Sequence, residues 1–208
     1  MGSQPAPTLL GDGKGTYRIL VVGNSGSGKT TLARKLSTLL GIKHLSLDAL
    51  WWKPGWQTST REEFQDELRK FFRENEERGW IIDGNFTSQS GGLPRAEATD
   101  VIWLDPPLIL YFPRLLIRTV QRLLSLVEPC SEGCDETWSE AFFSKNSILV
   151  WCLSQHWILR ERETNNLRLT SVENGTDVTN RKMRRLGGWG GEQEAWLKAV
   201  EELVIKAA

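Results

Sequence analysis

The stretch Gly23-Asn24-Ser25-Gly26-Ser27-Gly28-Lys29-Thr30 decides the fold, because it has the form G-x-x-x-x-G-K-[ST] of a phosphate-binding loop. Such a loop is informative only where a strand enters it and a helix leaves it. The β-branched run over 17–22 predicts a buried parallel strand before the loop. Residues 30–40 place four leucines on one face, which predicts a helix that ends at Gly41.

The residue types in this loop point to nucleotide binding. Glycines let backbone N–H groups surround an anion at the positive end of the helix. Lys29 is predicted to reach the β- and γ-phosphates, and the Thr30 hydroxyl to ligate Mg²⁺. The alternative, a glycine-rich turn that arose by chance, is disfavoured by the flanking strand and helix. We therefore expect ATP and Mg²⁺ as cofactors, with the nucleotide bound by Gly23, Asn24, Ser25, Gly26, Ser27, Gly28, Lys29, Thr30 and Thr31.

Composition excludes several classes of protein. The 208 residues contain 26 basic and 26 acidic side chains, a balance that argues against a general nucleic-acid binder. No apolar run is long enough to span a membrane and no signal peptide is visible, so we expect a cytoplasmic protein without a membrane partner. Cys130, Cys134 and Cys152 suit a reducing compartment, and we interpret them as structural. The basic run over 181–185 is interpreted as an exposed strand or lid contact rather than a DNA site.

Strands and helices alternate along the chain. After a flexible tail over 1–15, a single domain is expected over 16–208. Strands are predicted at 43–47, 80–85, 100–105 and, more weakly, 178–186. Helices are predicted from the Thr60 capping box to Gly79, over 108–126 and 147–163, the last capped by Asn146, and at the C-terminus; 164–180 is expected to be irregular. This order predicts a three-layer α/β fold with a parallel five-stranded sheet.

Acidic residues follow three of the predicted strands. Ligands of parallel sheets bind at the carboxyl ends of the strands, where Asp48, Asp83 and Asp105 stand with the phosphate-binding loop. Asp83 is predicted to hold Mg²⁺ together with Thr30, and its alternative role is a turn cap. Asp48 is predicted to orient or deprotonate an acceptor hydroxyl, and its alternative role is also a cap. Asp105 is expected to cap the helix that follows it.

A stripe of arginines marks the predicted helix over 108–126. Arg114, Arg118 and Arg122 lie four residues apart on one side, opposite an apolar side of Leu115, Leu116, Thr119, Leu123 and Leu126. No acid occurs from 106 to 127, so these cations are expected to lack local partners. With the acidic loop over 128–140, Arg160 and Arg162, they form a helical, arginine-bearing lid over 114–165. The alternative is a solvated helix face.

Four stretches together resemble a known family: GNSGSGKTTLARKLSTLLG, HLSLDALWWKPGW, GWIIDGNF and DVIWLDPP. They are similar to adenylate-kinase-like P-loop NTPases, whose members are variously labelled adenylate kinase or DNA topology modulation protein, and the resemblance covers about 17–205. It implies a small-molecule kinase fold with Asp48 on the acceptor side and with Arg118 and Arg122 leading into the lid. The chain lacks the D-G-F-P-R signature of true adenylate kinases, which argues against AMP as acceptor.

The sequence thus predicts a kinase that transfers the γ-phosphoryl group of Mg-ATP to a small-molecule acceptor: a nucleotide, nucleoside or other hydroxyl compound. Its predicted catalytic residues are Lys29, Asp48, Arg118, Arg122 and Arg160, and an aromatic segment within 48–79 is predicted to wall the acceptor side. A nucleotide-switched regulatory protein or a nucleic-acid-associated ATPase is the alternative. The acceptor's identity and the oligomeric state are left open.

Overall fold

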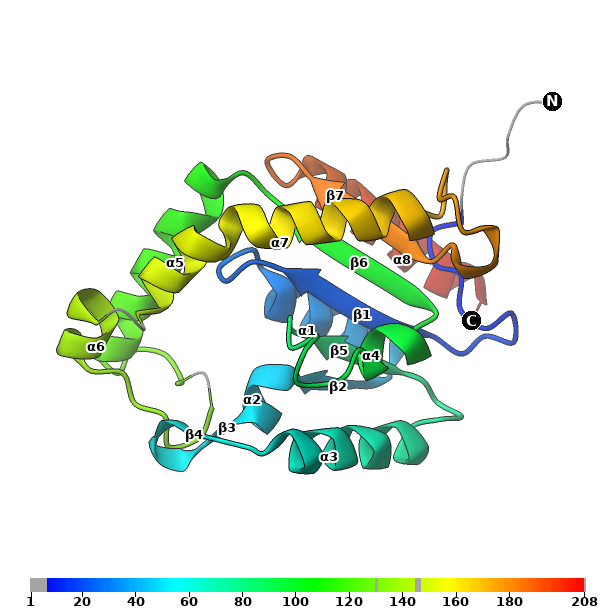
Figure 1. Cartoon of the computed structure of the whole chain (residues 1–208). Helices are drawn as coiled ribbons and strands as arrows, with labels where there is room; N and C mark the ends of the chain where they lie inside the picture. Colours follow the sequence, from blue (N-terminus) through cyan, green and yellow to red (C-terminus); the bar gives the residue numbers. More distant parts are fainter. Residues whose placement is uncertain (1–6, 130, 145–146, 208) are drawn as a thin grey trace.

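A parallel sheet forms the centre of the computed structural model, which describes residues 7–129, 131–144 and 147–207 (Figure 1). Its strand order is β2-β5-β1-β6-β7, and all neighbouring strands are parallel. This confirms the predicted α/β fold with a five-stranded sheet. The strands are β1 (Arg18–Gly23), β2 (Lys43–Ser46), β5 (Trp80–Asp83), β6 (Asp100–Asp105) and β7 (Met183–Gly187).

Helices cover both faces of the sheet because both faces are apolar. On one face, α1 (Lys29–Leu40) and α8 (Gly191–Ala207) bury Leu32, Leu36 and Val200. On the other, α3 (Arg61–Glu74) buries Phe64 and Leu68. The shorter helices α2 (Leu47–Trp51) and α4 (Leu93–Glu97) also lie on that face.

Two further helices form the region expected to be a lid, and the second half of the later one also runs across the sheet beside β7 (Figure 1). Helix α5 (Leu108–Leu123) packs against α7 (Ile148–Thr170) through a small cluster of Tyr111, Leu115 and Cys152. The short α6 (Trp138–Phe143) lies between them in the chain. Opposite, β3 (Trp52–Lys53) and β4 (Gln57–Thr58) form a hairpin around the turn η1 (Pro54–Trp56), and η2 (Val178–Asn180) precedes β7.

Several local predictions hold in the structure. Gly41 ends α1 in the left-handed region, and Thr60 and Glu63 make the two reciprocal hydrogen bonds of a capping box. The register aligns the strands at one edge, since Val21 and Ser46 both face Asp83. The carboxyl ends of the strands therefore meet where the phosphate-binding loop begins, as a parallel sheet requires.

The start of the chain differs from the prediction. Residues 7–15 were expected to be part of a flexible tail, but Leu9 is only 4% exposed and packs into the core beside α8. The Asp100 carboxylate accepts hydrogen bonds from the N–H groups of Leu10 and Gly11, at 2.8 and 3.0 Å. A buried carboxylate needs such donors, which holds this segment against the sheet. Residues 1–6 lie outside the described residues.

Other boundaries also need correction. Helix α7 continues to Thr170, so the first part of 164–180 is helical, and its N-cap is Ser147, while the predicted cap Asn146 lies outside the described residues. Helix α3 ends at Glu74, well before Gly79. Leu116 and Leu126, expected on the apolar side of α5, are exposed. Among the described residues, none of the helices combines the length and the apolar character needed to cross a bilayer.

Candidate phosphate-binding and acceptor site

The loop between β1 and α1 passes so close to its neighbours that two positions require glycine. A Cβ atom on Gly26 would lie 2.7 Å from the carbonyl oxygen of Tyr111, and one on Gly23 would lie 2.6 Å from that of Leu104. Gly26 also has a φ of 84°, in the left-handed region that favours glycine. The loop therefore takes a compact, positive-φ conformation of the kind that surrounds phosphates.

Two asparagines hold this loop in place. The buried Asn24 donates from Nδ2 to Tyr111 Oη on α5 at 2.9 Å and to the Cys152 carbonyl oxygen on α7 at 3.0 Å. Asn85, just after β5, accepts from the Gly23 N–H at 3.2 Å and donates to the Gly23 carbonyl. The sequence analysis missed both contacts. The contact of Asn85 could have been predicted from its position, since it directly follows the strand that pairs with β1.

The loop and the start of α1 fit a nucleotide phosphate. The N-cap of helix α1 is Gly28, which has no side chain to cap the helix, so the first N–H groups of α1 are suited to bind an anion. Lys29 Nζ lies 3.0 Å from the Asn24 carbonyl oxygen, so the ammonium spans the loop. Burial lowers the pKa of Lys29, while the charges of Asp83 and Asp48 act to raise it. A bound anionic ligand would likewise offset the cost of burying the charged Lys29 ammonium.

Thr30 and Asp83, the two predicted metal ligands, are in direct contact. Thr30 Oγ1 donates to Asp83 Oδ2 at 2.6 Å, and His44 Nε2 lies 2.8 Å from Asp83 Oδ1. Burial raises the pKa of the Asp83 carboxyl, but the bonds from His44 and Thr30 and the charge of Lys29 outweigh it, so the pKa lies below its usual value. The role of His44 was missed.

The Thr30 hydroxyl and the Asp83 carboxylate are better suited to Mg²⁺ than to a metal ion that is coordinated by protein side chains alone. Across residues 7–129, 131–144 and 147–207, no cluster of three or more His, Cys, Asp or Glu side chains could hold an ion. Mg²⁺ is usually bound by one or two carboxylates together with substrate phosphates and water. The hydroxyl of Thr30 and the carboxylate of Asp83, beside the phosphate-binding loop, offer that kind of partial shell.

Asp48 lies in the first turn of α2 rather than at the end of β2. It does not cap that helix, whose N-cap is Ser46. Burial raises the pKa of Asp48, as does Asp83, while Lys29, Arg118 and Arg122 act to lower it. The structure therefore brings these residues, from four separate elements, into one charged neighbourhood.

The arginines differ in their surroundings. Arg122 was expected to lack a local partner, yet its Nη1 lies 3.1 Å from Glu136 Oε1 because the loop after α5 folds back on the helix. Arg118 is half-buried, and Arg114 is exposed. Arg160 lies 3.3 Å from Asp105, whose carboxylate also receives Arg185 at 2.8 Å. Asp105 was expected to cap α5, but it holds these two arginines instead, and α5 has no side-chain cap.

The aromatic segment divides between the core and the β3–β4 hairpin. Trp51 packs against Phe64 and Phe86, with ring centroids 5.5 and 5.8 Å apart, and so belongs to the core. Trp52 and Trp56 instead stack edge to face on the hairpin.

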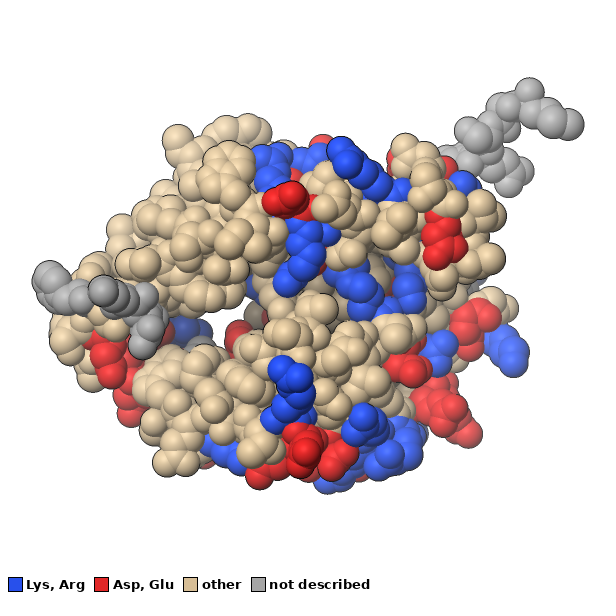
Figure 2. All heavy atoms as spheres, viewed as in Figure 1, with Lys and Arg blue, Asp and Glu red and all other residues tan. Residues whose placement is uncertain are grey.

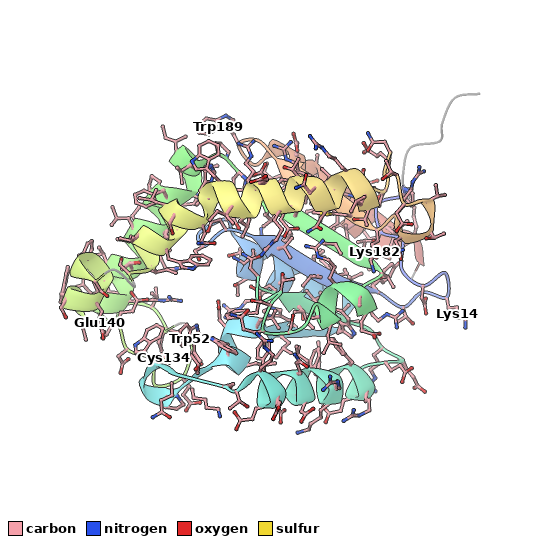
Figure 3. The ribbon with its side chains drawn as sticks, viewed as in Figure 1. Lys14, Trp52, Cys134, Glu140, Lys182 and Trp189 are labelled. Carbon is pink, nitrogen blue, oxygen red and sulfur yellow. The ribbon has the colours of Figure 1, made fainter. Side chains whose placement is uncertain are left out.

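The hairpin contacts the loop that follows α5. The Gly55 N–H donates to the Gly133 carbonyl, the Trp56 indole to that of Asp135, and the Ser131 hydroxyl to that of Trp52, each at 2.8 Å. Figure 3 shows Trp52 and Cys134 side by side at this junction, where the Cys134 thiol lies 3.3 Å from the Lys53 carbonyl oxygen. Figure 2 shows an opening between this side of the molecule and the phosphate-binding side, with charged atoms at its rim.

Comparison with known proteins supports this interpretation of the phosphate-binding side. A model of the shikimate kinase family matches residues 25–80, which include Lys29, Thr30 and Asp48. The chain is 30% identical over 128 residues to threonine synthase-like 1 of Mus musculus, a match that covers 56% of this chain and 17% of that protein. The chain thus spans only a small part of the length of this relative.

One solved structure shares the fold over most of the chain, and two others give weaker matches. TT1252 from Thermus thermophilus is 16% identical, with a TM-score of 0.50 over 92% of this chain and 97% of that one. A sugar kinase from Janibacter sp. HTCC2649 is 17% identical, with a TM-score of 0.48 over 91% and 93% of the two chains. A gluconokinase from Sinorhizobium meliloti 1021 is 13% identical, with a TM-score of 0.47 over 92% and 95%.

Proposed function

Since the chain is P-loop kinase-like in its fold and in its matched segment, we propose that it transfers the γ-phosphoryl group of Mg-ATP to a hydroxyl group of a small-molecule acceptor. The observation that carries the proposal is the position of Asp48. This carboxyl stands within electrostatic reach of Lys29 and Asp83 on the phosphate side and of Arg118 and Arg122 on the lid side. We infer that an acid in that position would stand between a bound triphosphate and an acceptor.

The phosphate side of this site binds and orients the nucleotide. Lys29 and the N–H groups of the loop would hold the β- and γ-phosphates, and Thr30 and Asp83 would hold the metal. Mg-ATP, when bound, supplies the phosphoryl group and much of the charge neutralisation. Residues Gly23 to Thr31 are the proposed nucleotide-binding set.

The acceptor side supplies the proton acceptor and the second group of cations. Asp48 Oδ would accept the proton of the acceptor hydroxyl, and a raised pKa brings a carboxyl closer to the range useful for a general base. Arg118 and Arg122 are the proposed cations that stabilise the transferred group, while Arg160, held by Asp105, supports the fold of the lid. The hairpin with Trp52 and Trp56 would exclude water from the acceptor pocket.

The proposal is tested by measuring ADP release from Mg-ATP across a panel of nucleosides, nucleotides, sugars and hydroxy acids. At least one class of acceptor should raise ADP release, and mass spectrometry should find the phosphorylated product. If ADP release is the same with every acceptor and without any, the chain is a slow ATPase, and the kinase proposal fails. Asp48→Asn should lower the acceptor-dependent rate while nucleotide affinity stays unchanged.

A further inference from the structure

The outer side of the two lid helices carries a broad apolar surface. Figure 2 shows an area over α5 and the first half of α7 without Lys, Arg, Asp or Glu. We call this surface the α5–α7 face. It is made by exposed side chains on both helices: Ile109, Leu116, Ile117, Val150, Trp151, Leu153, Trp157 and Ile158.

Helix α7 carries no charge in its first three turns, where its polar residues are Ser154, Gln155 and His156 and apolar side chains lie on both its inner and its outer side. Its inner side buries Cys152 and Leu159 against the rest of the fold. On its outer side, Trp157 is 69% exposed and Ile158 is 59% exposed. No charged residue occurs from Ser147 to Leu159. A helix that carries large apolar side chains on opposite sides is normally buried on both of those sides. The outer side therefore has the composition of a covered surface.

The extent of this face exceeds what a soluble monomer usually exposes. Contiguous apolar patches on monomers are typically limited to about 300–600 Å². Two exposed tryptophans, each offering up to about 150–250 Å², and six aliphatic side chains bring the α5–α7 face to the scale of one side of a stable protein interface, about 800 Å².

We propose that the α5–α7 face is the interface of a homodimer. Because the face has no charge of either sign, it can meet its own copy across a two-fold axis without placing like charges together. A membrane is the less suitable occupant for the α7 half of the face, since helices that lie on membranes carry Lys and Arg beside their apolar side, and the first three turns of α7 carry none. On α5, Arg118 and Arg122 belong to the charged neighbourhood of Asp48 instead.

The proposed interface does not overlap the candidate active site. On α5, the arginines at 114, 118 and 122 recur every four residues and so occupy a different side of the helix from Ile109 and Leu116. Dimer formation would leave Arg118 and Arg122 facing the phosphate-binding side. The proposal therefore stands independently of the proposed function, and it is tested without any substrate.

The test measures the oligomeric state of the full chain by sedimentation at concentrations from nanomolar to high micromolar. The wild-type chain should sediment as a dimer in the micromolar range. Ile158→Glu places two charges in the interface and should raise the dissociation constant at least about 100-fold. Ile205→Glu is the matched control, because Ile205 is 74% exposed but lies on α8, and it should dimerise like the wild type.

Three results would overturn the proposal. They are a wild-type chain that stays monomeric at all concentrations, an Ile158→Glu variant that dimerises normally, and a monomer that sediments with vesicles of phosphatidylcholine and phosphatidylserine. Circular dichroism checks that each variant is folded. If Ile158→Glu loses its helical signal, Trp157→Ala takes its place, because it removes the most exposed tryptophan of the face without adding a charge.

Discussion

The Asn24 amide in the phosphate-binding loop donates a hydrogen bond to the Tyr111 hydroxyl of α5 at 2.9 Å. The same hydroxyl lies 2.6 Å from His156 Nδ1 on α7. Burial raises the pKa of Tyr111 to about 12, so the phenol stays neutral and can accept from Asn24 while it donates to His156. This chain of three side chains joins the loop to both α5 and α7.

Tyr111→Phe should destabilise the protein and weaken nucleotide binding together. The substitution leaves His156 without its donor and Asn24 with only the Cys152 carbonyl, which costs about 1–3 kcal/mol for buried polar groups. Urea unfolding and ATP titration on the same preparation would measure both effects. Tyr17→Phe is the control, and it should change the free energy of unfolding by less than about 0.5 kcal/mol. An unchanged stability of Tyr111→Phe would show that the contact is unimportant.

Lys29→Ala should abolish Mg-ATP turnover without unfolding the protein. Loss of a cation aimed at the transferred group costs about 10²-fold or more in rate. Because burial disfavours the charged Lys29 in the folded protein, its removal should leave the melting temperature equal or higher. Lys35→Ala, an exposed position on the same helix, should leave turnover unchanged. Normal turnover in Lys29→Ala would rule out the proposed nucleotide role.

Asp83→Asn should lower both stability and the response to Mg²⁺. The folded-state pKa of Asp83 is depressed, so its stabilising contribution is present above the unfolded pKa and is lost as pH falls through the folded value. At neutral pH, the variant should lose about 1.5–3 kcal/mol, the range for hydrogen bonds to a charged group. Titration of turnover with Mg²⁺ should show a higher half-saturating concentration. If turnover responds to Mg²⁺ as in the wild type, Asp83 is purely structural.

Asp48→Asn should lower activity without lowering stability. The folded-state pKa of Asp48 is raised, so the folded protein binds more protons here than the unfolded chain, and stability falls as pH rises through this range. The neutral amide should therefore leave the melting temperature at pH 7 unchanged or higher. Acceptor phosphorylation should fall by about 10²–10⁴, the usual contribution of a general base.

The pH profile of the wild type provides a second check on Asp48. Activity should decline on acidification at a pH above the ordinary aspartate range, and the residual activity of Asp48→Asn should lack this limb. A lower melting temperature with normal acceptor kinetics would instead assign Asp48 a structural role.

Arg118→Ala should lower the rate of the reaction much more than Arg160→Ala. Arg118 shares the charged neighbourhood of Asp48 and Lys29, so its loss should lower the rate by about 10²-fold or more. Arg160 is 44% exposed in its side chain and pairs with Asp105, which Arg185 also holds, so its loss should change the rate little. Steady-state kinetics of both variants would compare them. If both variants lose the same activity, Arg160 acts in catalysis, as the sequence predicts.

The parts of the fold that the sequence predicts well are those set by local periodicity. The strand, loop and helix around Gly23 to Thr30, the capping box at Thr60 and the strand over 100–105 follow from patterns within a few residues. The alternation of strands and helices along the chain, which predicts a parallel sheet, also follows from such patterns. The predicted helix over 147–163 was too short because the polar second half of α7 lacks a clear apolar stripe. Glu163 is nevertheless buried in that half, where it forms ion pairs with Arg95 and Arg162.

The parts of the site that the sequence misses depend on contacts between distant elements. His44 and Asn85 reach Asp83 and the loop only because β2 and β1 both pair with β5. The partner of Arg122 comes from a loop that folds back, which no helix pattern encodes. Asp105 was predicted to cap α5, but Arg160 and Arg185, from later elements, provide stronger, charge-assisted partners.

The segment around Leu9 has a consequence for the lifetime of the folded state. Its hydrogen bonds to Asp100 span 89 and 90 residues, and the bond from the Trp196 indole to the Thr8 carbonyl spans 188. Closing loops of this length costs entropy before the contacts can form, so we expect these contacts to form late in folding, after the transition state. Interactions absent from that state slow unfolding without speeding folding. We therefore expect the segment over 8–11 to slow the unfolding of the finished fold more than it changes the rate of folding.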